Sequence, residues 1–302
     1  MINGIINVYK EAGYTSFDVV ARLRGILRIK KIGHTGALDP DAVGVLPVCV
    51  GNATKICDVL IDTDKQYRCT MLLGTKTDTY DTSGRVINQA SINVTQAQII
   101  QTVKSFVGDI NQMPPMYSAI KVNGKKLYEY ARKGETVELK PRPVSIYDIK
   151  IEDISLPYVT FTVDCSKGTY IRSLCNDIGE ALGCFGTMDK LIRTRAGKFM
   201  LENAISLDEI EQLSKENCLE EKFLSVDNYF DSYKAVFVNN STGDKKAING
   251  SLLEVEDLND NITFVSGEIV KVYTSDGRFV GIYEFKNNRL KILKMFLQNG
   301  NN

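Results

Sequence analysis

The chain of 302 residues has one histidine, His34, and no Cys-x-x-Cys pair among its seven cysteines. A zinc site built on several histidines is therefore excluded, and the cysteines lack the spacing of structural zinc sites. Any Ser-His-Asp triad or Cys-His pair would have to use His34. The sequence also lacks the Gly-x-x-x-x-Gly-Lys-Ser/Thr loop that cradles nucleotide phosphates. We expect neither a metal nor a cofactor, and mostly buried, reduced thiols.

Long hydrophobic runs are missing as well. The longest one, Val43–Val50, is interrupted by Gly44 and Pro47, whereas a helix that spans a bilayer needs about 20 apolar residues. The N-terminal residues show neither the basic region nor the apolar region of a secretion signal. We therefore expect a cytoplasmic monomer without a membrane segment.

The 37 basic and 37 acidic side chains balance, but they are unevenly distributed. Residues 10–31 carry a net charge of +4, residues 121–142 carry +4 and residues 189–198 carry +3, whereas residues 208–231 carry −6. Basic stretches that converge on one face form a groove suited to a polyanion. Residues 117–133, which include Lys121 and Arg132, mix basic and aromatic side chains most densely. We expect this segment to contact a nucleic-acid loop.

Hydrophobic periodicity predicts an irregular mixture of strands and helices before residue 232. Strands are expected at Ile5–Tyr9, Val43–Val50, Lys65–Leu73, Val144–Ile154 and Val159–Cys165. Helices are expected from Thr15 or Ser16 to Lys31, at Thr95–Val107 and at Tyr170–Leu182. In the first helix, Phe17, Val20, Leu23 and Leu27 recur at helical spacing, which is typical of a buried face. The mixture predicts an α+β domain, residues 1–232, with a mixed β-sheet and flanking helices.

The sequence changes character after residue 232. Short candidate strands separated by turns follow one another at Ala235–Val238, Ile262–Val265, Ile269–Tyr273, Phe279–Phe285 and Leu290–Phe296. They predict a small all-β domain over residues 233–302. The acidic segment Leu207–Asp231 is the expected hinge.

Residues 33–40, Gly-His-Thr-Gly-Ala-Leu-Asp-Pro, interrupt the periodicity between a basic helix and a buried strand. The two glycines let another molecule approach the backbone closely. Pro40 restricts Asp39 to an extended conformation. One carboxylate is thereby presented at a fixed angle on a loop between rigid elements, where catalytic groups are often found. An Asp-Pro turn with no catalytic role is the alternative interpretation of this segment alone.

A series of motifs in a fixed order resolves this choice. GHTGALDP is followed by KQY and TDTYDTSG, then by PPMYSAIKVNGKKLYEYARKG, CSKGTYIRSL and LIRTRAG. In this order they resemble the bacterial TruB family, the tRNA pseudouridine-55 synthases, from Ile5 to about Gly197. The resemblance implies a pseudouridine-synthase-like catalytic domain and a PUA-like RNA-binding domain at the C-terminus. It also implies that the substrate is uridine in the T-arm loop of tRNA.

The family's functional residues transfer to matching positions of this chain. Asp39 matches the catalytic aspartate, Tyr67 the tyrosine that stacks on the uracil, and Arg172 the arginine that pairs with the aspartate. The resemblance also implies substrate contacts for four further residues, which are Lys10 at the RNA-facing edge, His34 against flipped bases, and Tyr170 and Leu191 in the uracil pocket. Leu191 is followed by Ile192 and Arg193, where the family commonly has Leu-Arg-Arg.

The residue types suit the reaction. Isomerisation breaks the N-glycosidic bond, turns the base and rejoins it through C5, so no redox cofactor or ATP is consumed. A carboxylate near the ribose acts either as a nucleophile at C1′ or as a base at C2′. Arg172 is expected to lower the pKa of Asp39. The tyrosine supplies an aromatic face and a hydroxyl near C5, and the basic aromatic segment offsets the cost of extruding the base.

Two other classes of function compete with this interpretation. Gly33-His34-Thr35-Gly36 has the G-x-x-G form of a KH clamp in an RNA-binding module without catalysis, but a KH loop leads directly into a second helix. A glycoside hydrolase would use two carboxylates placed across a sugar. Asp41 lies two residues from Asp39, which is no sign of that geometry.

Overall fold

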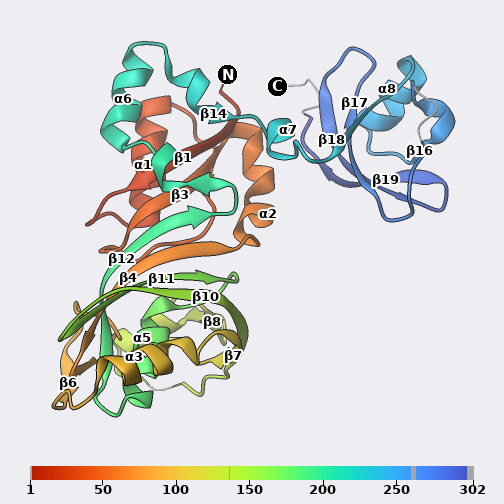
Figure 1. Ribbon diagram of the computed structural model, residues 1–302. Helices are drawn as coiled ribbons and strands as arrows, with labels where there is room; N and C mark the ends of the chain where they lie inside the picture. Colours follow the sequence, from red (N-terminus) through yellow and green to blue (C-terminus); the bar gives the residue numbers. More distant parts are fainter. Residues whose placement is uncertain (1, 136, 260–262, 298–302) are drawn as a thin grey trace.

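A ten-stranded mixed sheet forms the centre of the N-terminal part of the chain (Figure 1). The computed structural model describes residues 2–135, 137–259 and 263–297. Along the main path of the sheet the strands are β14 (Phe223–Leu224), β1 (Gly4–Lys10), β3 (Val43–Val50), β12 (Gly186–Ala196), β4 (Lys65–Leu73), β11 (Tyr158–Cys165), β10 (Arg142–Ser155) and β7 (Gly108–Gln112). Two short strands lie off this path, β2 (Ile32–His34) beside β3 and β13 (Phe199–Met200) beside β12.

The strand directions make the sheet mixed, as predicted. Strand β12 pairs antiparallel with β4 over most of its length and parallel with β3 at Ile192 and Arg193. The other neighbours along the path are antiparallel. The strands predicted at residues 43–50 and 65–73 have the bounds that the periodicity indicated.

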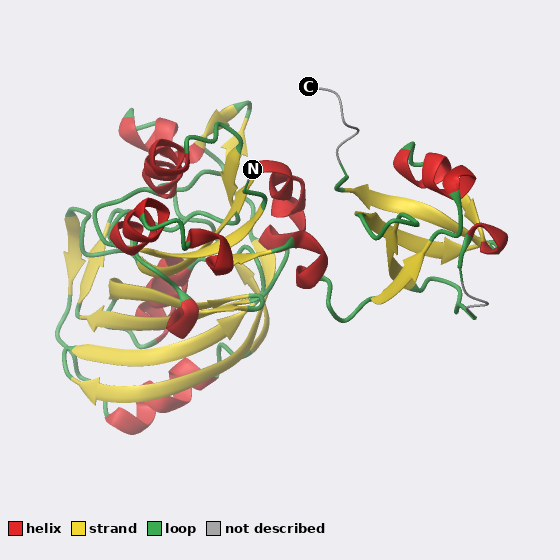
Figure 2. Ribbon diagram, turned by 90° about the horizontal axis from the view of Figure 1, so that it is seen from above, coloured by secondary structure: helices red, strands yellow, loops and turns green. Residues whose placement is uncertain are grey.

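Helices pack on both halves of the sheet and enclose two apolar cores (Figures 1 and 2). Helices α1 (Ser16–Leu27) and α6 (Leu207–Lys215) pack on β1 and β3 around Val20, Leu23 and Leu46. Helices α3 (Gln96–Lys104) and α5 (Ile171–Ala181) pack on β4, β10 and β11 around Phe161 and Leu174. Smaller elements complete this part of the chain: η1 (Gly51–Ile56), α2 (Cys57–Ile61), β5 (Thr75–Thr77), β6 (Val86–Gln89), β8 (Lys121–Val122), β9 (Lys125–Lys126), α4 (Leu127–Arg132), η2 (Leu201–Asn203) and η3 (Leu219–Lys222).

Helix α1 departs from its prediction at the end and on one face. It begins at a capping box in which Thr15 and Asp18 bond each other's backbone N–H groups, which satisfies two otherwise unpaired donors. It ends at Leu27 and not at Lys31, because Arg28 adopts a left-handed backbone (φ 55°). Phe17 was predicted on the buried face, but it is 69% exposed.

The acidic segment after residue 206 is more than a hinge. Strand β14 pairs with β1 and so belongs to the large sheet, and α6 packs on the same sheet. Only the short helix α7 (Val226–Tyr229) and the residues after it lead across to the C-terminal part (Figure 1).

A separate five-stranded sheet forms the C-terminal domain, in the order β15 (Lys234–Phe237), β17 (Ile269–Tyr273), β18 (Phe279–Lys286), β19 (Arg289–Met295) and β16 (Leu253–Glu254). Between β15 and β16 the chain also forms helix α8 (Ser241–Ile248), which the predicted all-β composition did not include, and η4 (Val255–Asp257) follows β16. The expected strand at 262–265 begins outside the described residues, and residues 263–265 are not a strand.

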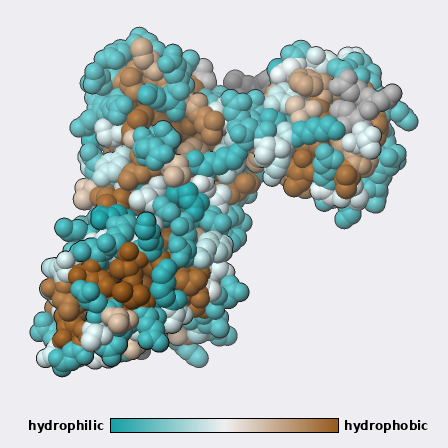
Figure 3. Space-filling view, in the orientation of Figure 1, coloured by the Kyte–Doolittle hydropathy of each residue, from teal (hydrophilic) through white to brown (hydrophobic). Residues whose placement is uncertain are grey.

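Apolar packing joins the C-terminal domain to the large sheet domain. Ile282 and Phe296 of the C-terminal sheet share a cluster with Phe230 and with Ile56 of η1. An ion pair between Lys294 and Asp58 lies beside this cluster. In the view of Figure 3 the surface is largely hydrophilic, with apolar side chains gathered over the lobe that carries α3 and α5. None of the helices in the described part of the chain is long and apolar enough to cross a bilayer.

Candidate active site

A cavity of about 770 Å³ opens where the loop before β3 faces the start of α5. Its wall brings together residues that lie far apart in the sequence, which are Asp39, Tyr67, Tyr170, Arg172, Leu191 and Arg193. Five of these six were candidate site residues. The cavity therefore collects the predicted loop carboxylate, the strand tyrosine and the helix arginine in one place.

Asp39 and Arg172 form a two-point ion pair at the cavity wall. Nη2 of Arg172 lies 3.0 Å from Oδ1 of Asp39, and Nε lies 3.0 Å from Oδ2. The Asp39 side chain is 39% exposed and that of Arg172 only 6%, so the carboxylate can be reached from the cavity while the guanidinium lies behind it. Such bidentate pairs fix the orientation of the carboxylate plane as well as its charge.

The guanidinium of Arg172 also holds two other segments. It donates hydrogen bonds to the carbonyls of Tyr117 (2.8 Å) and Thr79 (3.2 Å). Asp81, in the turn-rich TDTYDTSG segment, lies 3.5 Å from it. These contacts explain why Arg172 is buried and not on a helix surface, since its donors are satisfied inside the protein.

Burial in the cavity wall raises the pKa of Asp39 above its usual value, and the positive charge of Arg172 opposes that rise. The prediction that Arg172 lowers the pKa of Asp39 did not include burial, whose opposite effect is larger. It is right about the sign of the arginine's contribution. Partial loss of water around the carboxylate outweighs the ion pair.

The loop that carries Asp39 is held from three sides. The buried ammonium of Lys10 donates to the carbonyls of Pro40 (2.9 Å) and Ala42 (2.6 Å). The Ser16 hydroxyl accepts from the N–H of Leu38 (3.0 Å), and Arg193 donates to the carbonyl of Gly36 (3.2 Å). Lys10 is thus a support of this loop. Its prediction as an RNA contact is wrong for this structure, because the side chain has no exposed surface and burial lowers its pKa to about 8.

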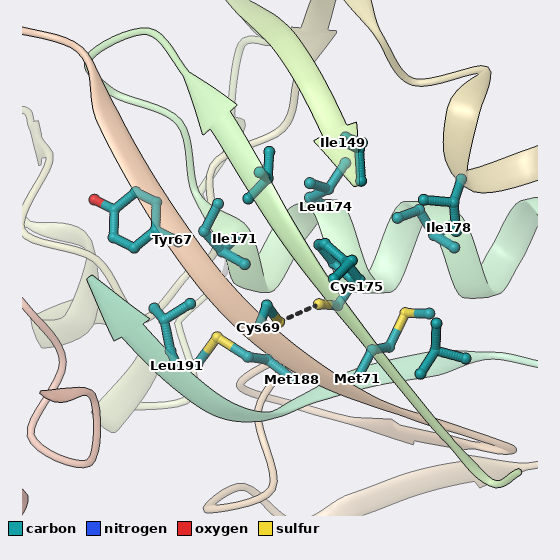
Figure 4. Packing of buried hydrophobic residues seen from close by; sticks show 14 of the residues in the cluster. Tyr67, Cys69, Met71, Ile149, Ile171, Leu174, Cys175, Ile178, Met188 and Leu191 are labelled. Atoms are coloured by element: carbon teal, nitrogen blue, oxygen red, sulfur yellow. Dashed lines mark hydrogen bonds between the residues drawn. The ribbon is translucent and has the colours of Figure 1, made fainter. Parts of the chain in front are cut away.

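Tyr67 and Leu191 line the cavity from neighbouring strands. In Figure 4 the Tyr67 hydroxyl points away from the packed cluster around Cys69 and Cys175, and Leu191 of β12 lies beside the ring. Burial raises the pKa of the Tyr67 hydroxyl, while the charge of Arg193 opposes the rise. Their placement agrees with the predicted pocket for a planar base.

Arg193 is a site residue that sequence reasoning missed. It is fully buried, donates to the carbonyl of Val45 (2.6 Å) as well as to that of Gly36, and lines the cavity beside Tyr67. Its signal in the sequence was a single arginine two residues after Leu191, which periodicity cannot distinguish from a solvated strand residue. Gly44 shows how close the backbones are, since a Cβ at this position would lie 2.3 Å from the carbonyl oxygen of Arg193.

His34 lies at the end of β2, with its ring edge-to-face against Phe17 at a centroid distance of 5.3 Å. Burial, and secondarily the charge of Arg193, lower its pKa, so the imidazole is neutral at neutral pH. Nδ1 is buried and has no hydrogen-bond partner among the described residues. Because β2 pairs with β3, the Gly-x-x-Gly residues do not form the free loop between two helices that a KH clamp requires.

The basic aromatic segment lines the cavity with two tyrosines, Tyr117 and Tyr128, and exposes most of its basic side chains. Tyr128 lines the cavity, and the cations of Lys126 and Arg132 lie 5.4 and 5.3 Å from its ring centre. Lys121 is exposed on β8. Tyr170 precedes α5, and the Gln112 side chain bonds both its backbone N–H (2.7 Å) and its carbonyl (3.0 Å). The residues predicted to contact the substrate thus form two groups, one in the cavity wall and one at its rim.

Comparisons with known proteins agree with this geometry. Residues 24–171 match the model described as TruB family pseudouridylate synthase (N terminal domain), and residues 172–232 match the tRNA pseudouridylate synthase B C-terminal domain. A tRNA pseudouridine synthase B from Lachnoclostridium phytofermentans is 50% identical, and one from Clostridium novyi is 46% identical. Each match covers 98% of this chain and 100% of the relative.

A solved structure titled "Structure of H/ACA RNP bound to a substrate RNA containing 2'-deoxyuridine" superposes with a TM-score of 0.72 at 26% identity. The match covers 98% of this chain and 86% of the other. Fold and sequence together define a pseudouridine synthase, an isomerase that acts on RNA. Within that class, the chain belongs to the TruB family.

Proposed function

We propose that this TruB-family isomerase converts the uridine at position 55, in the T-arm loop of tRNA, with Asp39, Tyr67 and Arg172 as its catalytic residues. Isomerisation of uridine to pseudouridine in tRNA is the activity of the family to which the chain belongs. The observation that carries the residue assignment is the two-point pair between Asp39 and Arg172 at the cavity wall.

Asp39 is the group that acts on the ribose. Its carboxylate is exposed to the cavity and fixed in orientation by Arg172. An ionised carboxylate in this place either attacks C1′ or removes the proton at C2′, and both routes break the bond between C1′ and N1. The uracil then turns and its C5 bonds to C1′, so no atom is gained or lost overall.

Tyr67 acts on the base. Its ring gives the uracil an aromatic face, and Leu191 closes the pocket from the next strand. When C5 bonds to C1′, the proton on C5 must leave, and we place the Tyr67 hydroxyl near it. The charge of Arg193 favours the phenolate that accepts such a proton, against the effect of burial.

The substrate loop must open to reach this cavity. A stacked uridine leaves its neighbours at a cost of a few kcal/mol, and aromatic and basic side chains around the pocket offset that cost. Tyr128 and Arg132 at the rim have these properties. We propose that the segment around Lys121 and Arg132 inserts against the T-arm loop, and that His34 packs against bases next to the target.

The remaining assignments extend this proposal to the whole chain. We propose a catalytic domain at residues 1–232 and a PUA-like RNA-binding domain at 233–302, with a monomer acting in the cytoplasm, where tRNA is abundant. The match to the C-terminal family model ends at residue 232, and the second sheet begins at β15. Both observations support a boundary near this position.

The test is incubation with unmodified tRNA followed by chemical mapping of pseudouridine. We expect modification at position 55, and we expect Asp39→Asn to lower turnover by more than about a thousandfold while tRNA binding survives. Asp41→Asn is the matched control, because Asp41 is an exposed carboxylate two residues away. Unchanged turnover in Asp39→Asn, or modification outside the T-arm only, would contradict the proposal.

A further inference from the structure

Phe17 is an aromatic side chain that the fold does not use. It is 69% exposed, although it lies in the first turn of a helix whose neighbouring Val19, Val20 and Leu23 are fully buried. None of the four apolar clusters of the described residues includes it. The capping box at Thr15 and Asp18 is complete without its side chain. An exposed phenyl ring without a packing role is a candidate for a binding contact.

The fold holds Phe17 beside the active-site loop. Thr15, two residues before it, lines the cavity. The hydroxyl of Ser16, the residue before it, accepts the N–H of Leu38, and Leu38 precedes Asp39. The first turn of α1 is therefore tied to the loop that presents the carboxylate, so a group that enters the cavity passes near this turn.

The rings of Phe17 and His34 lie perpendicular to each other, and Phe17 remains largely exposed. The two ring planes are at 89° with centroids 5.3 Å apart. A perpendicular pair of rings forms a corner in which a flat π-system can stack on one ring while its edge meets the other. His34 is neutral at neutral pH, so this corner does not repel or select charge by itself.

Positive charge continues from Phe17 along the same side of the helix. Arg24 lies seven residues later and so shares the face of Phe17. Arg28 follows just after the end of the helix, and both arginines are exposed. Lys30 and Lys31 follow and are exposed as well. An aromatic platform that leads into a row of cations matches a nucleotide, with its base on the ring and the chain's phosphates along the helix.

We propose that Phe17 is the stacking platform for a second extruded base of the substrate loop, next to the target uridine, with the adjoining phosphates along Arg24 and Arg28. This subsite rests on the proposed function, because it needs an RNA loop at the cavity. It is distinct from the uracil pocket, which Tyr67 and Leu191 line. Its occupant is recognised by the π-face and not by a base edge, so the subsite tolerates different bases.

The test compares Phe17→Ala, Phe17→Leu and Phe17→Tyr in the full chain. The RNA is a T-arm hairpin in which 2-aminopurine replaces each loop nucleotide other than the target in turn. Dissociation constants, steady-state kinetics and the fluorescence of the saturated complex are measured. Ile100→Ala is the matched control, because Ile100 is 45% exposed on α3 and does not line the cavity.

Loss of one base–aromatic stack predicts a KM and a Kd about ten- to a hundredfold higher in Phe17→Ala, with kcat within about twofold of the original. Phe17→Tyr is expected to retain the original affinity, whereas Phe17→Leu is not. In the complex with Phe17→Ala, the fluorescence of 2-aminopurine at one loop position is expected to increase. Equal Kd values for Phe17→Ala and the original chain would overturn the proposal. Full rescue by leucine would also overturn it, because plain apolar contact would then suffice.

Failure of the proposed function gives a different result. A chain that modifies no uridine in tRNA or the hairpin, yet binds the hairpin more weakly after Phe17→Ala, refutes the proposed function and supports the platform. A chain that modifies position 55 with unchanged affinity after Phe17→Ala supports the function and refutes the platform. Thermal unfolding of each variant shows that its fold is intact.

Discussion

At the scale of single residues, one guanidinium joins three segments of the chain. Arg172 binds both carboxylate oxygens of Asp39, the carbonyl of Tyr117 at the start of the basic aromatic segment, and that of Thr79. Removal of this side chain leaves a carboxylate in the cavity wall without its countercharge, which costs much more than an exposed ion pair would. Arg172 therefore sets both the charge and the position of Asp39.

The pH dependence of turnover is a test of the ion pair between Asp39 and Arg172. Because burial raises the pKa of Asp39 above 3.8 while Arg172 lowers it, the ionised form on which the proposed mechanism depends is lost as the pH falls through the raised pKa. Arg172→Gln removes the opposing charge, so we expect the acid limb of kcat/KM to move to higher pH. A profile of residual activity between about pH 4 and 8 measures the shift. An acid limb that stays in place would show that Arg172 has no electrostatic hold on Asp39.

The roles of the Tyr67 hydroxyl and of the Tyr67 ring can be tested separately. Tyr67→Phe keeps the stacking face and the packing against Leu191, so we expect tRNA affinity to change less than about threefold. The rate of isomerisation is expected to fall by about a hundredfold or more, since a positioned proton acceptor contributes that much. Single-turnover rates and Kd values for tRNA distinguish the effect on isomerisation from the effect on binding. Equal losses in both would contradict a role in proton transfer.

At the scale of elements, helix α1 positions the catalytic loop through one hydroxyl. Ser16 is buried and accepts the N–H of Leu38, which has no other hydrogen bond among those described. Ser16→Ala leaves this buried donor unpaired, which costs about 1–3 kcal/mol. We expect a lower Tm and a lower kcat with little change in KM, because the loop and not the RNA surface is affected.

Thr95→Ala is the matched control for that prediction. The Thr95 hydroxyl likewise accepts one backbone N–H, that of Gln98, but at the start of α3 and away from the Asp39 loop. It should lower Tm by a similar amount and leave kcat unchanged. A fall in kcat in both variants would show that general loosening, and not the loop contact, limits turnover.

Local patterns predicted most of these elements and some of their details. Alternation fixed the bounds of β4 because every second residue from Lys65 to Leu73 faces a core. The end of α1 was missed because the left-handed backbone at Arg28 has no glycine to signal it. Helix α8 was missed because its eight residues, with a glycine and two small hydroxyl residues, have weak helix propensity and a short apolar pattern.

For a similar reason, only some of the residues of the candidate site and of their surroundings could be predicted. Asp39, Tyr67, Arg172, Tyr170 and Leu191 lie on motifs with a family pattern, and all five reach the cavity. Burial, however, is set by the packing of distant segments. Sequence alone could not show that Lys10 is enclosed, that Arg193 lies beside Tyr67, or that Phe17 is left outside the core.

At the scale of the whole molecule, aromatic packing attaches the C-terminal domain. Phe296 of that domain lies 6.0 Å from Phe230 of the large sheet domain, measured between ring centroids, and 5.6 Å from Phe279 of its own domain. Phe296→Ala removes these contacts, so we expect the two domains to separate more readily and KM for full-length tRNA to rise. Turnover of a T-arm hairpin should stay within about threefold. Faster proteolysis near residues 230–234 would report the separation.

Leu293→Ala is the control for this prediction, because Leu293 lies on β19, three residues before Phe296, and is 47% exposed. It should change neither proteolysis nor KM. Equal effects of Phe296→Ala on the hairpin and on full-length tRNA would show that the domain contributes to catalysis itself and not only to binding the rest of the substrate.

The parallel pairing of β12 with β3 has a mechanical consequence. It spans Ile192–Val43 and Arg193–Gly44 and joins the half of the sheet with α1 to the half with α5. The Arg193 side chain bonds the backbone of the first half from this seam. If the two halves twist against each other to admit a bulky loop, points on the seam move least. The proposed reacting groups lie near this seam, so the distance between the ribose and the Asp39 carboxylate would change least during such a twist.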